Sequence, residues 1–335
     1  MRPREKGVAA FDRLQALVAE DLEAVNQIIR NRMVSEAAPL IKALAEHLIS
    51  AGGKRLRPIL TLAAAQMCGY GGEHHRRLAA TVEFIHTATL LHDDVVDGSV
   101  RRRGKDAANI VWGNKPSILV GDFLFSRAFQ LMVETGSLRV LEILSTASAV
   151  IAEGEVLQLS TVSDLTEDDG KYMQVVTAKT AALFEAATEV GGVIAGAPEP
   201  QIDALRTYGG GLGVAFQLVD DVLDYGGVDA DAALGKAVGD DFRESKATLP
   251  VLLAYGQGDA DERSFWERCI RNRDQEPADL ERAIEILRRR GALAQTLERA
   301  RGIVDDASAA LLAMPAGAHR DALEDVAEYV VERAR

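Results

Sequence analysis

Residues 84–97 read FIHTATLLHDDVVD, and residues 217–224 read QLVDDVLD. Each stretch ends in the pattern D-D-x-x-D after apolar residues that have helical spacing and no helix breaker. On a helix, the first and last aspartates of each pattern lie one turn apart on the same face. Such close carboxylates repel one another, so we expect a cation between the two motifs. Mg²⁺ is the natural candidate because it binds proteins through one or two carboxylates plus substrate phosphates.

Paired aspartates are common in this chain, and a pair alone indicates only a solvated helix face or a helix cap. Three other pairs lack a third aspartate four residues after the first one: Asp168-Asp169, Asp240-Asp241 and Asp305-Asp306. The two completed motifs contain valine and leucine, and they lie on segments that are apolar nearly all round, as buried helices are. Buried carboxylates need metal or cationic partners. The sequence therefore predicts a metal site between the two motifs.

Basic residues gather near the acidic motifs. The run KRLR at 54–57 follows Gly52-Gly53, and Pro58 suits the first turn of the next helix, so these charges lie at a helix N-terminus that favours an anion. The triplet Arg101-Arg102-Arg103 follows the first motif, where arginines can grip phosphate in a bidentate manner. His86 lies two turns before Asp93 on much the same face. A basic loop tip and a solvated triplet are the simpler alternatives.

Composition limits the class of protein. The 335 residues are 47% hydrophobic and 27% charged, which is typical of a soluble globular protein. A net charge of −13 argues against a nucleic-acid partner. The two cysteines, Cys68 and Cys269, form no CxxC motif, so we expect neither a disulfide framework nor zinc, and a cytoplasmic location. No stretch is long and apolar enough to predict a transmembrane span.

The periodicity of apolar residues predicts helices throughout the chain. They are expected at 11–29, 39–50, 59–67, 78–97, 118–133, 138–160, 172–190 and 202–225, with further helices in 251–335. Alternating strands and repeats are missing, which favours one all-α domain spanning 1–335, a large helical bundle. Within it we expect peripheral helices in 1–50, the motifs in 50–250 and C-terminal helices in 251–335. The glycine-rich stretch 226–239 is the longest predicted loop, and long loops are often lids.

From about residue 50 to 250 the chain resembles the trans-isoprenyl diphosphate synthases, also called polyprenyl synthetases. Besides the two D-D-x-x-D motifs, the matching residues are GGKRLRP at 52–58, Arg102-Arg103-Gly104, Lys179-Thr180, Gln217 and Lys236, all in the family's order. The resemblance implies the isoprenoid synthase fold, a helical bundle around a deep central cavity, and a homodimer. It also implies head-to-tail condensation of an allylic diphosphate with isopentenyl diphosphate, with three Mg²⁺ ions per site when substrate is bound.

The resemblance also assigns roles to single residues. Isopentenyl diphosphate would be bound by Lys54, Arg57, His86 and Arg103. The allylic diphosphate would be bound by Arg102, Lys179, Thr180, Gln217, Lys236 and Lys246. Asp93, Asp97 and Asp220 would hold Mg²⁺, assisted by Asp94, Asp221 and Asp224, and catalysis would rest on Asp93, Asp97, Asp220, Lys179 and Arg102. Ser245 stands where the family commonly has glycine, which leaves the conformation of that loop open.

Product length is predicted from the residues before Asp93. Short-chain members of the family commonly carry a bulky aromatic at the positions of Ala88 and Thr89, and none is present here. We therefore expect the cavity to continue past Ile85 toward a floor near Met132 and Leu144. The predicted product is an octaprenyl to decaprenyl diphosphate for a quinone side chain, released through a transient membrane contact.

Other readings stay open at this point. A shorter-chain farnesyl or geranylgeranyl diphosphate synthase would share every motif. A terpene cyclase would use the same metal-triggered ionisation but would have no need of the basic residues that bind isopentenyl diphosphate. A non-catalytic metal-binding bundle, or a silent partner subunit, is the non-enzymatic alternative. The intact set of Asp, Arg and Lys residues favours the condensing enzyme.

Overall fold

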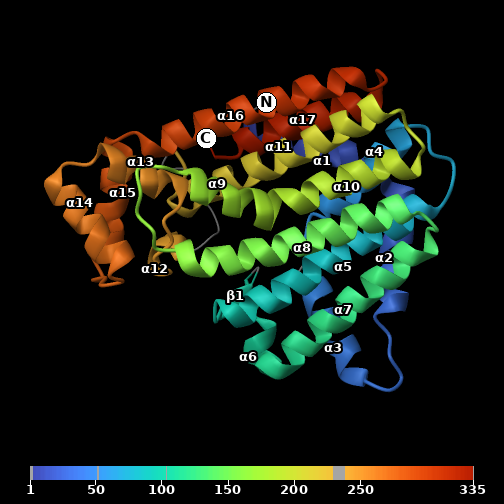
Figure 1. Ribbon diagram of the computed structural model, residues 1–335, viewed down its shortest axis with the longest axis horizontal. Coiled ribbons are helices and arrows are strands. Elements are labelled where there is room, and N and C mark those ends of the chain that lie inside the picture. The colour runs from blue at the N-terminus through green and yellow to red at the C-terminus, as the bar shows by residue number, and fades with distance from the viewer. Residues whose placement is uncertain (1–2, 51–52, 103, 229–237, 335) are drawn as a thin grey trace.

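The computed structural model describes residues 3–50, 53–102, 104–228 and 238–334 (Figure 1). The α-helices in these residues are α1 (Pro3–Leu17), α2 (Ala19–Arg32), α3 (Pro39–Ser50), α4 (Leu56–Met67), α5 (His74–Val96), α6 (Ala108–Trp112), α7 (Asn114–Glu134), α8 (Leu138–Thr161), α9 (Gly170–Val176), α10 (Ala182–Ile194), α11 (Glu199–Asp224), α12 (Asp240–Arg243), α13 (Leu249–Gln257), α14 (Ala260–Trp266), α15 (Asp279–Arg289), α16 (Ala292–Ala310) and α17 (Ala318–Glu332). Shorter elements are the strands β1 (Arg101–Arg102) and β2 (Lys105–Asp106), the π-helical turns η1 (Thr177–Ala181) and η3 (Glu267–Arg271), and the 3₁₀ turn η4 (Leu311–Ala313). The predicted all-α class is confirmed.

The two motif helices lie inside the bundle. The first motif ends α5, which packs mainly against α7 and also against α4, α2 and α10. The second ends α11, which packs against α10 and α16. Both helices are lined by core residues over most of their length, so their carboxyl-terminal turns reach the interior without leaving the apolar core. The long helices α8, α10, α11 and α16 run along the long axis, and α13 to α15 gather at one end (Figure 1).

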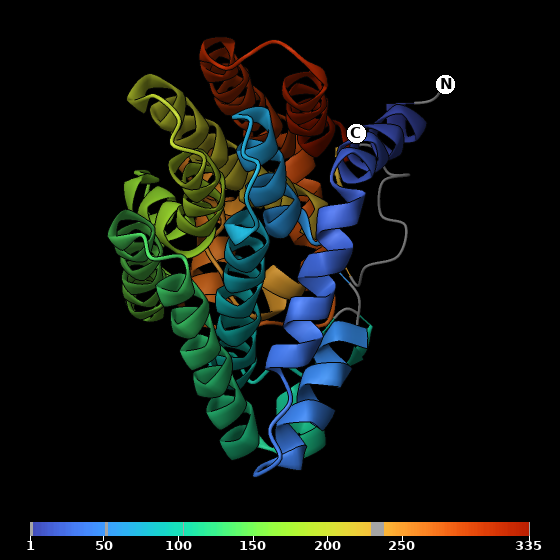
Figure 2. The same cartoon turned by 90° about the vertical axis from the view of Figure 1, so that its right-hand side faces the viewer.

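The predicted helix 11–29 is two helices in the structure. α1 ends at Leu17, Val18 takes φ −113° and ψ 14°, and α2 begins at Ala19. The two helices have different partners, since α1 packs on α17 and α2 packs on α5. A straight helix cannot follow both surfaces, so the chain turns at Val18. Figure 2 shows α1 beside the chain end marked C.

Two short strands after the first motif, β1 and β2, form a small hairpin. β1 and β2 are antiparallel, with Arg101 opposite Asp106 and Arg102 opposite Lys105. Gly104 at the turn has φ 80°, a conformation that favours glycine. The hairpin directs Arg102 back toward the end of α5. Most of the predicted glycine-rich loop, 229–237, lies outside the described residues.

One helical rod carries a π turn at the site. α9, η1 and α10 follow one another without a break from Gly170 to Ile194, and η1 contains Lys179 and Thr180. A π turn widens the helix by one residue, and such turns are frequent at functional sites. It changes the direction in which these two neighbouring side chains leave the helix, and both line the same cavity. None of the described helices is long and apolar enough to cross a membrane.

Candidate active site

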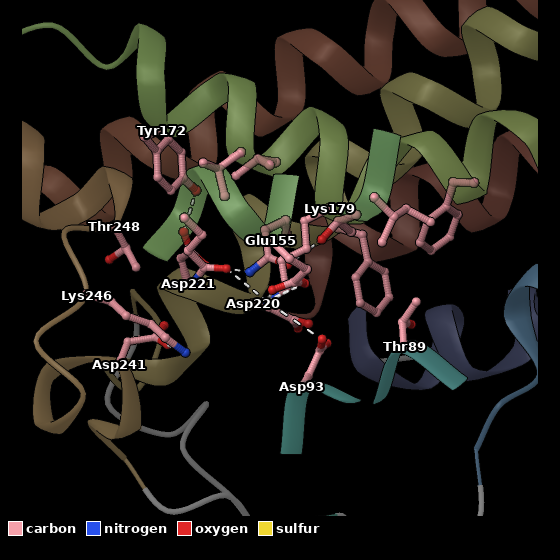
Figure 3. Close-up of a pocket in the computed structure, with 18 of the residues that line it drawn as sticks. Thr89, Asp93, Glu155, Tyr172, Lys179, Asp220, Asp221, Asp241, Lys246 and Thr248 are labelled. Atoms are coloured by element: carbon pink, nitrogen blue, oxygen red, sulfur yellow. Dashed lines mark hydrogen bonds and ion pairs between the residues drawn. The ribbon is translucent and has the colours of Figure 1, made fainter. Parts of the chain in front are cut away.

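A cavity of about 720 Å³ lies where the carboxyl-terminal turns of α5 and α11 meet. Most of the predicted site residues line it: Lys54, Arg57, His86, Asp93, Asp97, Arg102, Lys179, Thr180, Gln217, Asp220, Asp221 and Lys246. Asp93 projects from α5 and Asp220 from α11 toward the middle of the cavity, with Lys179 above them (Figure 3). Arg103 and Lys236 lie outside the described residues. The structure thus brings together residues that are up to 192 positions apart, from Lys54 to Lys246.

Asp93, Asp97 and Asp220 line one part of the cavity, here called the acidic end, and Lys179 lies among the residues of this part. Its Nζ lies 2.7 Å from Oε1 of Glu155, 2.9 Å from Oε1 of Gln158 and 4.0 Å from Oδ2 of Asp93. Burial raises the pKa of Asp93 to about 7; the Lys179 charge lowers this pKa, and the Glu155 and Asp97 charges raise it. Glu155 and Gln158 of α8 therefore orient the lysine.

Asp94 is not part of the cavity wall, and its predicted role beside the metal stays a prediction. Its side chain is buried, and Oδ1 accepts a hydrogen bond from Nε of Arg102 at 2.7 Å, with Nη2 at 2.6 Å. Successive residues of a helix point in different directions, so Asp94 leaves the face that Asp93 and Asp97 share. It holds Arg102 at the cavity rim.

Asp224 is not part of the cavity wall either, and its predicted role as an assisting metal ligand stays a prediction. Its carboxylate accepts hydrogen bonds from the backbone N–H groups of Asp240, at 3.2 Å, and Asp241, at 3.1 Å, at the start of α12. This contact places Asp241 in the cavity wall, 3.6 Å from Nζ of Lys246. Burial and the nearby Asp241 charge raise the pKa of Asp224 to about 7. The pair Asp240-Asp241 lacks a third aspartate, so no motif in the sequence pointed to Asp241.

Asp221 is buried in a hydrogen-bond network. It accepts from the Tyr172 hydroxyl and from Nε2 of Gln217 at 2.8 Å, and Oε1 of Gln217 accepts from the Thr180 hydroxyl at 3.0 Å. Burial, and then the charge of Asp241, raise the pKa of the Asp221 carboxyl. Both of its oxygens already have donors. Asp221 therefore anchors the end of α11 to the helical rod that carries Lys179, and Tyr172 had no sequence signal that pointed to it.

The basic residues Lys54, Arg57 and His86 form another part of the cavity wall, here called the basic end. Nζ of Lys54 donates to the Tyr329 hydroxyl at 3.2 Å, and it lies 5.5 Å from the Phe11 ring centre and 5.2 Å from that of Tyr329. Nη1 of Arg57 lies 3.3 Å from Nε2 of His86. Three of the four residues predicted to bind isopentenyl diphosphate, Lys54, Arg57 and His86, therefore line one cavity. The first and last described helices supply the aromatic groups around its lysine.

Two neighbouring aromatic rings each contact one arginine of the cavity wall. The Arg57 guanidinium lies 4.2 Å from the Phe184 ring centre, and that of Arg333 lies 4.1 Å from the Phe216 ring centre. The two ring centres are 5.6 Å apart. Each guanidinium is attracted to the electron-rich face of its ring. Arg333, at the C-cap of α17, was not predicted, because nothing in its local sequence distinguishes it from other helix-ending arginines.

The predicted chain-length residues divide into two groups. Thr89 lines the cavity, together with Leu90 of the same helix and Ile151 of α8. The others are fully buried in the surrounding core and are not part of the wall: Ile85, Ala88, Met132 and Leu144. The cavity therefore ends near Thr89 in this conformation, and the predicted floor lies beyond it.

The acidic end suits a divalent cation that arrives with phosphate. Within the described ranges, no three His, Cys, Asp or Glu side chains are close enough to form a ready-made metal site. Asp93 and Asp220 nevertheless face one cavity from different helices, and Oδ1 of Asp220 is buried without a hydrogen-bond donor in the described part of the chain. Mg²⁺ is commonly bound by one or two carboxylates plus substrate phosphates, so these residues fit it.

Metal affinity should depend on pH because Asp93 must be ionised to bind a cation. Its pKa is raised to about 7, so the carboxyl is protonated below this pH and metal binding releases a proton. We expect the affinity for Mg²⁺ in the presence of inorganic diphosphate to rise about tenfold between about pH 6 and pH 8. Calorimetry in buffers of different ionisation enthalpy measures both the affinity and the proton release. A pH dependence that persists unchanged in Asp93→Asn would assign the proton to another group.

Comparisons with known proteins identify the family. A family model of polyprenyl synthetase matches residues 38–287. The chain is 45% identical to octaprenyl diphosphate synthase of Escherichia coli (strain K12), over 97% of this chain and 99% of that protein. This chain therefore belongs to the polyprenyl synthetase family, and the predicted resemblance is confirmed.

Solved structures agree with this assignment. A decaprenyl diphosphate synthase from Rhodobacter capsulatus superposes with a TM-score of 0.94 at 57% identity, over 97% of this chain and 99% of that one. A polyprenyl synthase from Caulobacter crescentus CB15, complexed with calcium and isoprenyl diphosphate, gives a TM-score of 0.92 at 55% identity, over 97% and 98%. The fold around the cavity is thus that of polyprenyl synthases.

Proposed function

We propose that this protein is a prenyltransferase that condenses an allylic diphosphate, such as farnesyl diphosphate, head-to-tail with successive isopentenyl diphosphate units. The observation that carries the proposal is one cavity whose wall holds two groups of functional side chains. Asp93, Asp220 and Lys179 belong to the first group, and Lys54, Arg57 and His86 belong to the second. Two such groups can bind two diphosphates, as a two-substrate condensation requires.

The side chains around the acidic end prepare the allylic diphosphate to leave. Asp93, Asp97 and Asp220 would hold Mg²⁺, with three ions per site when substrate is bound. The metal would neutralise the negative charge that builds on the departing diphosphate. Lys179, Lys246 and Arg102 add positive charge in the same wall. The bond between the allylic carbon and the diphosphate oxygen breaks, and both electrons leave with the diphosphate. No Ser or Cys nucleophile is needed.

The rest of the cavity controls the fate of the allylic cation. Phe184, Phe216 and Thr89 belong to a wall that keeps water from it. The basic end holds isopentenyl diphosphate by its diphosphate, so its double bond faces the cation, and the electrons of that double bond form the new carbon–carbon bond. A proton then leaves to the released diphosphate. Repeating the cycle lengthens the chain by one isoprene unit each time.

We propose a long all-trans product of the octaprenyl to decaprenyl class. The relatives that support this length are the octaprenyl synthase of Escherichia coli and the decaprenyl synthase of Rhodobacter capsulatus. The use of this product for a quinone side chain, a transient membrane contact for its release and a cytoplasmic location belong to the same proposal.

The test is to incubate the purified protein with Mg²⁺, farnesyl diphosphate and isopentenyl diphosphate, and to measure product length by mass spectrometry. We expect products of eight to ten isoprene units, following the relatives named above. Hydrocarbon formed from farnesyl diphosphate alone would favour a terpene cyclase. A folded protein that consumes neither substrate would favour a silent subunit.

Replacing Lys54 should separate the two substrates. In Lys54→Ala the basic end loses a charge that is held between Phe11 and Tyr329. We expect the KM for isopentenyl diphosphate to rise about 10- to 100-fold, because a hydrogen bond to a charged group commonly contributes this factor to affinity. The KM for the allylic diphosphate should change little. Initial rates with each substrate varied in turn measure this. Lys42→Ala, on the exposed face of α3, is the control, and equal losses for both substrates would contradict the assignment.

We also propose a homodimer that uses the outer face of α7 and α8. Large apolar side chains that are each at least 65% exposed lie on this face: Leu119, Val133, Leu138, Val156 and Leu159. Exposed apolar patches on soluble proteins commonly mark interaction sites. A second copy is the partner that the family resemblance implies.

The double variant Leu119→Glu, Val156→Glu should therefore be monomeric in light scattering, while the unchanged protein is a dimer. Buried glutamates facing one another across a two-fold interface repel and lose their water. Leu312→Glu, which changes an equally exposed leucine on η4, should leave the dimer intact. A dimer that survives the double substitution would place the interface elsewhere.

A further inference from the structure

Arg333 stands beside one of the carboxylates that the proposed function gives to a metal. Its Nη2 lies 2.8 Å from Oδ1 of Asp220, and the two side chains are 19% and 28% exposed. The same Nη2 donates a hydrogen bond to the carbonyl oxygen of Phe216 at 3.0 Å, and the guanidinium lies over the Phe216 ring. The arginine is therefore fixed by Phe216 and contributes its charge to Asp220.

The contact neutralises Asp220 without completing its hydrogen bonding. Within the described residues, Oδ1 of Asp220 is buried and receives no hydrogen bond, because the nearest N–H group is directed at Phe216. A buried carboxylate oxygen without a donor is costly and keeps its lone pairs available. By contrast, both oxygens of the neighbouring Asp221 have donors. Asp220 is thus charge-compensated but still open to a ligand.

The backbone around Arg333 is held in place. The Tyr208 hydroxyl donates to the carbonyl oxygen of Leu323 in α17 at 2.7 Å, and the N–H of Val228 donates to the carbonyl oxygen of Ala334 at 3.1 Å. The contact between Arg333 and Asp220 can therefore be released by a change of side-chain rotamer, while α17 keeps its position.

We propose that Arg333 is a built-in counter-cation that competes with the divalent metal for Asp220. A metal at Oδ1 would stand close to the guanidinium, and the two positive charges repel one another. The metal alone therefore binds weakly. A diphosphate brings negative charge that satisfies both cations, so metal and diphosphate strengthen each other's binding, and this coupling is reciprocal. The inference rests on the proposed function of Asp220 as a metal ligand and adds a reason for the metal to load together with substrate.

The experiment measures metal binding without turnover. Calorimetric titration with Mn²⁺ alone, and again with inorganic diphosphate present, gives the affinity and the coupling factor for each variant. In Arg333→Gln we expect Mn²⁺ alone to bind about five- to tenfold more tightly, and the coupling factor to fall by the same ratio. Arg333→Met, which keeps contact with the Phe216 ring, is a second neutral variant that should behave alike. Arg333→Lys keeps the charge and should retain weak metal binding.

Two controls isolate the contact. Arg13→Gln removes the ion pairs of α1 with Asp321 and Asp325 of α17 without touching the cavity, so it tests a loosened helix alone. In an Asp220→Asn background, Arg333→Gln should have no effect on metal affinity. Unchanged or weaker Mn²⁺ binding in folded Arg333→Gln or Arg333→Met would overturn the inference, as would equal tightening in Arg13→Gln. None of these binding measurements requires prenyl transfer. Their result could therefore still be interpreted if the protein lacked the proposed activity.

Discussion

Replacing Asp93 with asparagine is expected to lower kcat by about 10³-fold or more while the protein stays folded. Asparagine has the same shape but no charge, so the acidic end loses a ligand for the cation that neutralises the leaving diphosphate. Asp220→Asn should behave in the same way, since Asp220 faces the same cavity from α11. Initial rates with saturating substrates measure the effect. Asp203→Asn, an exposed change on α11 whose partner is Arg206, should leave the rate unchanged.

The same substitution should stabilise the metal-free protein at alkaline pH. The pKa of Asp93 is raised by burial to about 7 in the folded protein, above its value near 3.9 in an unfolded chain. Such a group favours the folded state below pH 4, and this stability is lost as the pH rises toward 7. At pH 8 in EDTA, Asp93→Asn should therefore raise the free energy of unfolding, on the order of 2 kcal/mol. Little difference should remain near pH 4.

Urea denaturation at both pH values, followed by circular dichroism, tests this expectation. A loss of helical signal in Asp93→Asn would mean that the residue is structural rather than a metal ligand. A kcat within a few-fold of the unchanged protein would remove Asp93 from the chemistry. The two readouts are independent, because the unfolding experiment contains no metal.

Replacing Thr89 with phenylalanine is expected to shorten the product to about farnesyl or geranylgeranyl length. Thr89 lines the cavity, so an aromatic ring there would enter the space that the growing chain fills. The cavity volume of about 720 Å³ is in the range of sites for drug-sized ligands. A product of eight or more isoprene units needs more room, so the core beyond Thr89 must open as the chain grows. Mass spectrometry of products at excess isopentenyl diphosphate measures the change.

Two further variants define the path of the chain. Thr89→Val keeps the volume of the side chain and removes only its hydrogen bond to the His86 carbonyl oxygen, so product length should not change. Ala88→Phe should also shorten the product if the growing chain passes between Ala88 and the region of Met132 and Leu144. One helical turn of α5, roughly 5.4 Å, then corresponds to about one isoprene unit of the chain. Full-length product from Thr89→Phe would show that the chain leaves the cavity by another route. Full-length product from Ala88→Phe alone would place the route on the other side of α5.

What helical geometry predicts from the sequence lies on single helices. Helical spacing places Asp93 and Asp97 on one face, and by the same rule Asp94 leaves that face. The contact of Asp224 could not be predicted, because its partner, the start of α12, comes from a later segment. Arg333 lies 113 positions after Asp220, and such a contact exists only once α17 packs on α11. Tyr172 is hidden for the same reason, since its hydrogen bond to Asp221 joins two separate helices.

The neighbouring rings of Phe184 and Phe216 each carry one arginine of the cavity wall. The ring centres are 5.6 Å apart, and the guanidinium groups of Arg57 and Arg333 lie 4.2 Å and 4.1 Å from their respective ring centres. Both charges are thus held by aromatic side chains of α10 and α11, although Arg57 belongs to α4 and Arg333 to the C-cap of α17. Exchange of one ring for a smaller side chain would remove the contact that fixes its arginine while every helix stayed in place. A single aromatic position can therefore change where a positive charge stands in the cavity without any change of the residue that carries it.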